Sequence, residues 1–192
     1  MTTGALRFDD TVTSAEERRR FLELLALPAG ARVLEAIDGG VWGIEAIFDG
    51  VLCIDAIAHV SDRARLIADW ARVVKPGGRI LYTDPAIVAG QLTSDEIALR
   101  SSMGLLVFSC QGENELLIEA GGLRLLRADD GTDAIALAAS RLRAERATDE
   151  HALIASEGRE AYDARQRFLD VAHRLAHERR LARIAFLAER SP

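Results

Sequence analysis

The feature that most constrains the fold of this chain is a strand-helix-strand pattern in its first half. Residues 50–55 form a short apolar run, as expected of a buried strand. Residues 64–74 then place apolar side chains at helical spacing, and residues 79–84 form the next apolar run. This alternation of strand and helix predicts a parallel sheet with right-handed crossover connections.

The boundaries of these elements carry the usual stop and start signals. Residues 75–78, with the sequence Lys-Pro-Gly-Gly, predict the end of the helix before the strand at 79–84. Ser14 and Glu17 have the spacing of a capping box, which predicts a helix from there to about residue 27. Residues 32–37 are then expected to form the first strand, and we expect it to lie beside the strand at 50–55.

The second half of the chain is predicted to be mostly helical and to end on a strand. Its apolar stretch at 103–108 is interpreted as a flap over a pocket. The last strand could pair antiparallel with the strand that precedes the long helical stretch, because both flank that stretch. One helix is expected to begin at 92–96, and three more are expected to cover 114–120, 132–147 and 149–180. The expected strands cover 123–127 and 183–188.

The whole chain is expected to fold as a single domain. Of its 192 residues, 49% are hydrophobic and 28% charged, which is typical of a globular protein with one core. The predicted class is α/β: a Rossmann-like, mainly parallel sheet flanked by helices. An N-terminal helical segment covers 1–31, and a helical insertion at 132–180 precedes the last strand.

Charge and composition exclude several classes of protein. Lys and Arg number 24 against 30 Asp and Glu, which gives a net charge of -6, so nucleic acid is not an expected partner. No apolar run approaches the roughly 18 residues of a membrane helix. Cys53 and Cys110 lie in apolar stretches and no secretory leader is recognised, which predicts a reduced, cytoplasmic protein without a disulfide framework.

Three stretches resemble class I S-adenosylmethionine-dependent methyltransferases. They are residues 48–59 (FDGVLCIDAIAH), the pair Asp62 and Arg63, and residues 70–85 (WARVVKPGGRILYTDP). They look like the fourth and fifth strands of that fold with the helix between them. The resemblance implies S-adenosylmethionine as the cofactor and methyl transfer to a small-molecule acceptor.

The chain departs from this family at the cofactor loop. The family's first strand ends in a loop of the form acidic-x-Gly-x-Gly-x-Gly, whose backbone approaches the cofactor; here residues 35–41 read Glu-Ala-Ile-Asp-Gly-Gly-Val, so only one of the three glycines matches. The acidic residue that binds the ribose hydroxyls in the family corresponds best to Glu45. The cofactor-binding residues that the resemblance implies are Glu35, Gly39, Gly40, Glu45, Asp55 and Ala56.

Length makes this departure concrete. The intact fold places two βα units between its first and fourth strands, and one βαβ unit needs about 30 residues. Only the 14 residues 36–49 are available here, close to the minimum of about a dozen for a crossover between parallel strands. We therefore expect a smaller sheet that has lost the half that holds adenosine in the family.

Three residues near the carboxyl ends of strands are candidate catalytic groups. They are His59, Asp84 and Glu113, each of which could act as a base. A helix cap explains His59 and Glu113 equally well, and a turn before Pro85 explains Asp84. Metal catalysis is not expected, because His173 and His177 share a helix face without a third ligand. The cluster Arg174, Arg179, Arg180 and Arg183 is interpreted as surface salt bridges.

Two functions remain open from the sequence. One is a small-molecule methyltransferase with a degraded cofactor loop. The other is a shortened homologue that has lost catalysis and serves as a binding or subunit protein, or that uses its pocket for other chemistry. In both cases we expect weak or absent S-adenosylmethionine binding. The outer edge of the strand at 32–37 lacks its usual neighbours, so we expect it to be covered, either by association with another chain or by the Trp42 segment and the helix that begins at Ser14.

Overall fold

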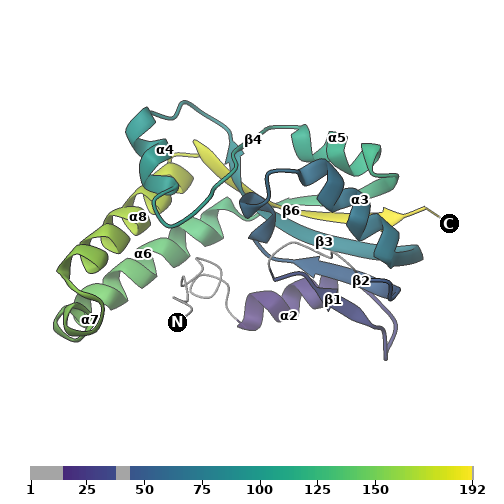
Figure 1. The fold of residues 1–192 in the computed structure, drawn as a ribbon, viewed down its shortest axis with the longest axis horizontal. Coiled ribbons are helices and arrows are strands. Elements are labelled where there is room, and N and C mark those ends of the chain that lie inside the picture. Colours follow the sequence, from purple (N-terminus) through teal and green to yellow (C-terminus); the bar gives the residue numbers. More distant parts are fainter. Residues whose placement is uncertain (1–14, 38–43, 192) are drawn as a thin grey trace.

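Six strands form one mixed sheet in the computed structural model, which describes residues 15–37 and 44–191. The order is β1-β2-β3-β6-β5, with β4 also pairing β3 (Figure 1). The pairs β1-β2, β2-β3 and β3-β4 are parallel, whereas β6 runs antiparallel to both β3 and β5. The predicted Rossmann-like class is thereby confirmed. The strands are β1 (Val33–Glu35), β2 (Phe48–Cys53), β3 (Val74–Val88), β4 (Ser109–Cys110), β5 (Leu123–Asp130) and β6 (Leu181–Arg190).

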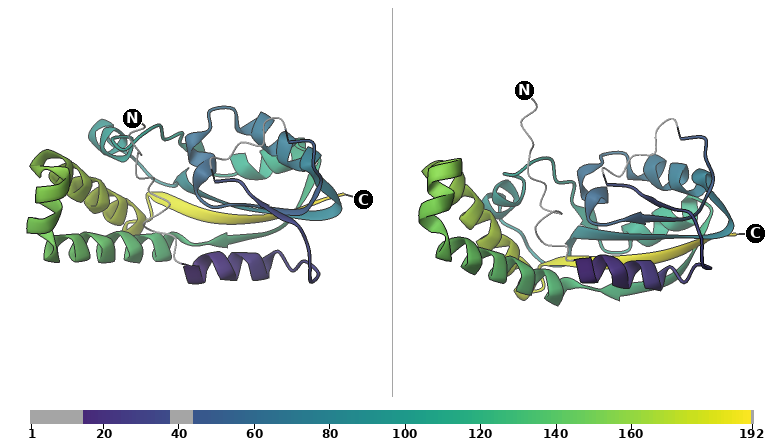
Figure 2. Two further views of the ribbon diagram at one scale, coloured as in Figure 1. Left: turned by 60° about the horizontal axis from the view of Figure 1, so that its bottom comes forward. Right: turned by 90° about the horizontal axis from the view of Figure 1, so that it is seen from below.

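Helices cover both faces of this sheet. One face carries α3 and α5, the opposite face carries α2, and α6, α7 and α8 form an arm that extends beyond the end of the sheet (Figures 1 and 2). Within the described ranges, no helix combines the length and apolar character that a membrane crossing requires. The helices are α2 (Ala15–Leu24), η1 (Ala56–His59, a 3-10 turn), α3 (Arg63–Val73), α4 (Ser94–Arg100), α5 (Glu113–Ala120), α6 (Thr132–Thr148), α7 (Glu150–Glu157) and α8 (Arg159–His177).

The strand pleat divides the core into two layers. In β2, Val51 and Cys53 pack against α3 and α5, where Trp70 is fully buried. Leu52, between them, faces the other way and packs against Phe21 of α2. Alternate residues of a strand point to opposite faces, so a strand that is apolar throughout serves both layers. This is why the run at 50–55 has no polar alternation.

The turn predicted at 75–78 belongs to a strand. Helix α3 ends at Val73 as expected, but β3 begins at Val74, pairs with Phe48 and then shifts register before Arg79 pairs with Gly50. The extra residues bulge against β2, where a Cβ on Gly78 would lie 2.7 Å from the Asp49 carbonyl oxygen. The glycine is needed there for close approach of two backbones.

Three other boundaries differ from the prediction. Helix α2 ends at Leu24, two residues before Ala26, which has a left-handed φ of 48°; Ser14 of the expected capping box is outside the described residues. The strand expected to end before Pro85 continues to Val88 through a register shift. The helix expected at 149–180 is two helices, because Gly158 has a φ of 87° that interrupts the helical backbone.

The short connection between the first two strands is confirmed as a parallel crossover. Val33 pairs with Gly50 and Glu35 with Leu52, and β1 ends the strand order. Gly39, Gly40 and Trp42 are outside the described residues. Association of a second chain along β1 stays a prediction.

Helix α4 is attached to the arm by a cluster of charges around Glu96. The Glu96 side chain is buried and accepts hydrogen bonds from Arg180 at 2.6 and 2.9 Å and from Arg174 at 2.7 Å. Glu96 also completes a capping box with Thr93. Arg174 and Arg180 were expected to form surface salt bridges; instead they share one buried carboxylate and join α8 and the start of β6 to α4.

Removing this carboxylate should destabilise the protein in a pH-dependent way. Arg180, with Thr93 and Arg174, holds the pKa of the Glu96 carboxyl well below its usual range. Its contribution is therefore present above the unfolded pKa of about 4.3 and is lost as the pH falls below that value. We expect Glu96→Gln to lower the urea midpoint at pH 7, with a difference from the unmodified protein that shrinks toward pH 3. Asp95→Asn, on an exposed neighbour, is the control, and a pH-independent difference would contradict this account.

Candidate functional site

The carboxyl end of β2 is built around Asp55, a residue that is completely buried and has a left-handed φ of 57°. The Asp55 amide donates to Thr83 Oγ1 at 2.7 Å, and the Thr83 hydroxyl donates to Asp55 Oδ1 at 2.6 Å. This reciprocal pair connects a residue just after β2 to the interior of β3. Open α/β sheets bind ligands at this edge, so the pair stands where the sequence analysis expects the cofactor.

Arg183 of β6 completes this cluster and corrects an expectation. Only 2% of the residue is exposed, and its Nε donates to Asp55 Oδ1 at 2.7 Å while Nη1 donates to Glu17 of α2 at 2.5 Å. Although burial acts to lower it, the carboxylates of Asp55 and Glu17 raise the pKa of Arg183 above its usual range. Arg183 was expected on the surface; it instead neutralises a buried carboxylate and ties α2 to the sheet.

One oxygen of Asp55 is left over. Oδ2 is buried and has no hydrogen-bond partner among the described residues. A buried polar atom without a partner costs about 1–3 kcal/mol, so a donor group from a ligand or a water would be stabilised here. Ala56, the next residue, begins η1 and is 1% exposed. The end of β2 therefore combines a buried carboxylate oxygen, without a partner among the described residues, and a tight backbone turn.

The carboxylate of Asp84 at the neighbouring strand is saturated by donors. Its Oδ2 accepts from Arg63 Nη1 at 2.5 Å, Ser109 Oγ at 2.7 Å and Asn114 Nδ2 at 2.9 Å. Its Oδ1 accepts from the Ala86 amide at 3.0 Å. The residue is completely buried. Asp84 therefore holds α3, β4 and α5 together, and it would have to release a partner before it could accept a proton from a substrate.

The other catalytic candidates also have structural partners. Nδ1 of the exposed His59 donates to the Leu105 carbonyl at 2.6 Å, which fixes the ring against the 103–108 segment. Glu113, the first residue of α5, accepts from the Cys110 amide at 2.9 Å and so ties β4 to the start of this helix. The N-cap residue of α5 is Gly112, without a side-chain cap bond, so the capping alternative for Glu113 is wrong. The hydrogen bonds of the three candidates go to separate partners and do not join them into one catalytic group.

The acidic cofactor candidates are in different situations. Glu35 ends β1 and is bound by Arg18 of α2, at 2.8 Å from Nε and 2.5 Å from Nη2. Arg18 holds the pKa of Glu35 below its usual range. Glu45 is exposed and lies in the connection that precedes β2. The other two candidates of this loop, Gly39 and Gly40, cannot be placed because they are outside the described residues.

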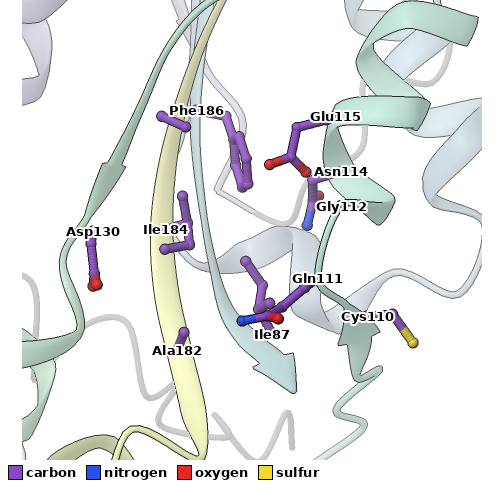
Figure 3. A pocket seen from close by; sticks show the side chains of 11 residues that line it. Ile87, Cys110, Gln111, Gly112, Asn114, Glu115, Asp130, Ala182, Ile184 and Phe186 are labelled. Atoms are coloured by element: carbon purple, nitrogen blue, oxygen red, sulfur yellow. The ribbon is translucent and has the colours of Figure 1, made fainter. Parts of the chain in front are cut away.

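A pocket of about 320 Å³ lies between the sheet and the start of α5. Its floor is apolar, with Ile184 and Phe186 of β6, and Gln111 and Glu115 extend toward these residues from the α5 side (Figure 3). Asn114, held by Tyr82 and Asp84, lies in the wall. No Lys, Arg or His lines the pocket along the described chain. It therefore suits a small ligand with an apolar body and a neutral or positively charged polar group.

The sequence analysis missed the arginines that organise both sites. Arg63 was quoted as part of a motif but was given no role, and Ser109 was not considered. No local signal marks Arg63 as buried, because an arginine at the start of an amphipathic helix is usually exposed unless it is paired. For metals, the described residues contain no group of three or more His, Cys, Asp or Glu suited to an ion.

Comparisons with known proteins agree with this architecture. A family model described as a methyltransferase domain matches residues 44–82. A methyltransferase from Streptomyces halstedii is 33% identical over 89 residues, which are 43% of this chain and 31% of that protein. The resemblance to class I S-adenosylmethionine-dependent methyltransferases is thereby confirmed for the central part of the chain.

Solved structures show the same fold. A provisionally assigned sarcosine dimethylglycine methyltransferase from Galdieria sulphuraria has a TM-score of 0.71 at 20% identity, covering 92% of this chain and 65% of that one. Phosphoethanolamine N-methyltransferase 2 from Haemonchus contortus, in complex with S-adenosyl-L-methionine, has a TM-score of 0.68 at 20% identity, covering 76% of this chain and 34% of that one. The chain thus spans less than two thirds of each of these relatives.

The Asp84 cluster should dominate the stability of this end of the sheet. Replacing Arg63 by Met leaves a buried carboxylate without its counter-charge, and breaking a buried pair in this way costs about 3–5 kcal/mol. We expect that loss in the free energy of unfolding for Arg63→Met, measured by urea denaturation. Arg65→Gln, on the exposed face of the same helix, should cost no more than about 1 kcal/mol. Equal losses in the two variants would contradict the assignment.

Proposed function

We propose that this chain, which has the class I S-adenosylmethionine-dependent methyltransferase fold, transfers the methyl group of S-adenosylmethionine to a small-molecule acceptor. The observation that carries the proposal is the match of residues 44–82 to a methyltransferase domain. This segment contains β2, η1, α3 and the first part of β3. These are the elements that place Asp55 and Ala56 at the ligand-binding edge of the sheet.

The residues at this edge fit part of the cofactor. Asp55 Oδ2 is a buried acceptor without a partner among the described residues, and the left-handed backbone at Asp55 turns the chain sharply into η1. Asp55 and Ala56 would hold the cofactor here, with Glu45 as the exposed acidic group for the ribose hydroxyls. Bound S-adenosylmethionine supplies an electrophilic methyl group on a sulfonium. The protein's part is to align the acceptor and exclude water, and alignment accounts for a large share of such rate enhancements.

The cofactor site is nevertheless reduced in comparison with the intact fold. The 14-residue connection before β2 leaves no room for the two βα units of the family, and β1 ends the strand order. Both Glu35 oxygens accept from Arg18, so Glu35 would have to exchange this ion pair for the cofactor. We therefore propose that the protein binds S-adenosylmethionine more weakly than a methyltransferase with the complete ribose site.

The pocket beside α5 is our candidate for the acceptor site. It lies along the carboxyl-terminal parts of β3 and β5, through Ile87, Ala128 and Asp130. Its rim carries the carboxylate of Glu115, and no cationic side chain among the described residues lines it. These features favour an amine as the methyl acceptor. The names of two of the similar structures state sarcosine, dimethylglycine or phosphoethanolamine, which are amines, whereas others of the same fold are mycolic acid cyclopropane synthases, so the amine rests on the lining of the pocket.

A second function, binding of a small molecule without methyl transfer, is supported by the hydrogen bonds that occupy the candidate bases. Asp84, Glu113 and His59 each have a protein partner, and the cofactor half of the fold is short. A protein that binds a small molecule without methylating it would show the same features. Cofactor binding and methyl transfer, measured together, separate this alternative from the enzyme.

We predict a weak but measurable affinity for S-adenosylmethionine in titration calorimetry. The loss of the two hydrogen bonds that an acidic residue makes to ribose, at about 1.5–3 kcal/mol each, would reduce affinity by about two to four decades. If Glu45 supplies part of this contact, Glu45→Gln weakens binding further by about tenfold, whereas Glu119→Gln on exposed α5 has no effect. Tight binding of S-adenosylmethionine that is insensitive to Glu45→Gln would contradict the proposal that the cofactor site is reduced. The absence of both S-adenosylmethionine binding and methyl transfer would contradict the methyltransferase and favour a protein that binds a small molecule without methylating it.

Filling the pocket should block the acceptor and spare the cofactor. Ala128 lies at the pocket on the exposed part of β5, so Ala128→Trp places a large side chain in the cavity without disturbing the core. We expect KM for the acceptor to rise by at least about tenfold with an unchanged dissociation constant for S-adenosylmethionine. The assay uses dimethylglycine, sarcosine and phosphoethanolamine as acceptors. Arg127→Trp, whose side chain faces the opposite side of the sheet, is the control, and an equal effect of both variants would argue against this pocket.

A further inference from the structure

The 103–108 segment is attached to η1 by hydrogen bonds that start from the Asp84 cluster. Arg63, 4% exposed, donates from Nη1 to Asp84 and from Nη2 to the Val107 carbonyl at 2.6 Å. The Val107 amide then donates to the Ala58 carbonyl at 2.7 Å. Two residues earlier, the Leu105 carbonyl accepts from His59 Nδ1 at 2.6 Å. We call residues 105–107, with these three contacts, the clasp.

The clasp has no support from regular secondary structure. Residues 105–107 belong to no helix or strand, and Leu105 is 61% exposed. Apolar packing therefore contributes little to holding Leu105, and the polar contacts fix the backbone. Two of the three contacts end on η1, and the third ends on Arg63, whose orientation is set by Asp84.

From this geometry we infer that Arg63 and Asp84 are positioning residues: they fix the clasp against η1 and thereby set the shape of the turn Ala56–His59, which contains the cofactor candidate Ala56. This inference rests on the proposed function, because η1 follows Asp55 directly and begins with the cofactor candidate Ala56. Asp84 then acts through Arg63, and it does not act as the base that its position at the end of a strand first suggested.

The fork geometry of arginine makes the role specific. Arg63 uses two different nitrogens for Asp84 and for the Val107 carbonyl. A lysine carries its charge on a single nitrogen, so Arg63→Lys can keep the ion pair with Asp84 and lose the contact with Val107. A purely structural role predicts a normal protein once the charge is retained. A positioning role predicts a stable protein with a released clasp.

The test compares Arg63→Lys with the unmodified protein by two measurements. The first is amide hydrogen exchange of Val107, with the amides of Leu81 and Tyr82 in β3 as a report on global stability. We expect exchange at Val107 to become at least about tenfold faster while the β3 amides remain protected. The second is the dissociation constant of S-adenosylmethionine, which we expect to rise by about fivefold to tenfold, roughly the loss of one hydrogen bond.

Further variants keep the outcome decisive. His59→Leu removes a clasp contact at an exposed position and should produce a smaller change in the same direction at both readouts. Arg65→Gln, on the same helix as Arg63, should change neither. If Arg63→Lys proves unstable, His59→Leu still decides whether the clasp sets cofactor affinity, and Asp84→Asn, which removes the charge that orients Arg63, decides the role of the Arg63–Asp84 pair by the same two measurements.

The possible results separate this inference from the proposed function. Faster Val107 exchange with an unchanged dissociation constant would overturn the positioning role, and unchanged exchange would overturn the clasp itself. If the unmodified protein binds no S-adenosylmethionine at millimolar concentration, the proposed function fails. The exchange measurement alone then decides whether Arg63 holds the clasp.

Discussion

The structure depends on the neutralisation of two buried aspartates, one just after β2 and one within the adjacent strand β3. Asp55 and Asp84 are both completely buried, and a buried charge without a partner is strongly unfavourable. Arg183 supplies the counter-charge for Asp55 and Arg63 supplies it for Asp84. The element that brings each arginine must therefore be in place before this edge of the sheet is stable. That requirement links α2, α3, α5 and β6 around one edge.

This arrangement gives the ligand-binding edge a rigid base although the sheet is small. Thr83 joins the two aspartate clusters, because it bonds Asp55 from the residue next to Asp84. A site whose side chains are locked by such partners is pre-organised. The same partners remove Asp84 from the set of free bases. A methyltransferase can function with a rigid site that lacks a free base at Asp84, since alignment of donor and acceptor contributes much of the rate enhancement.

The short connection between β1 and β2, in contrast, reduces the part of the fold that is available to hold a cofactor. It keeps the two strands parallel and in register but leaves a small cofactor side. The region that follows β3 in the chain is longer than this connection: it contributes to the pocket beside α5 and forms the long arm of α6, α7 and α8 (Figures 1 and 2). The protein thus combines a short connection before β2 with a pocket beside α5. This combination is the reason that the proposed function pairs weak cofactor binding with a defined acceptor pocket.

The sequence by itself determined all of the strands except β4, the neighbours β1-β2-β3, the antiparallel β5-β6 pair and the family resemblance. Periodicity and turn residues are local properties, so they placed β2, α3 and β5 close to their observed positions, and the length of the connection at 36–49 predicted the direct β1-β2 crossover. Local signals also mark the capping of α4 by Thr93 and Glu96. The break at Gly158 was missed because a lone glycine inside a helical pattern is often tolerated.

Only the tertiary structure decided what the charged residues do. Asp55 and Arg183 are 128 positions apart in the chain, and no local pattern distinguishes an arginine that will be buried against a carboxylate from one on the surface. The same holds for Arg63 and the clasp, whose partners come from α3, β3 and an irregular segment. Ion pairs and hydrogen bonds act over a few ångströms in space, so their partners are fixed only when the sheet brings distant segments together.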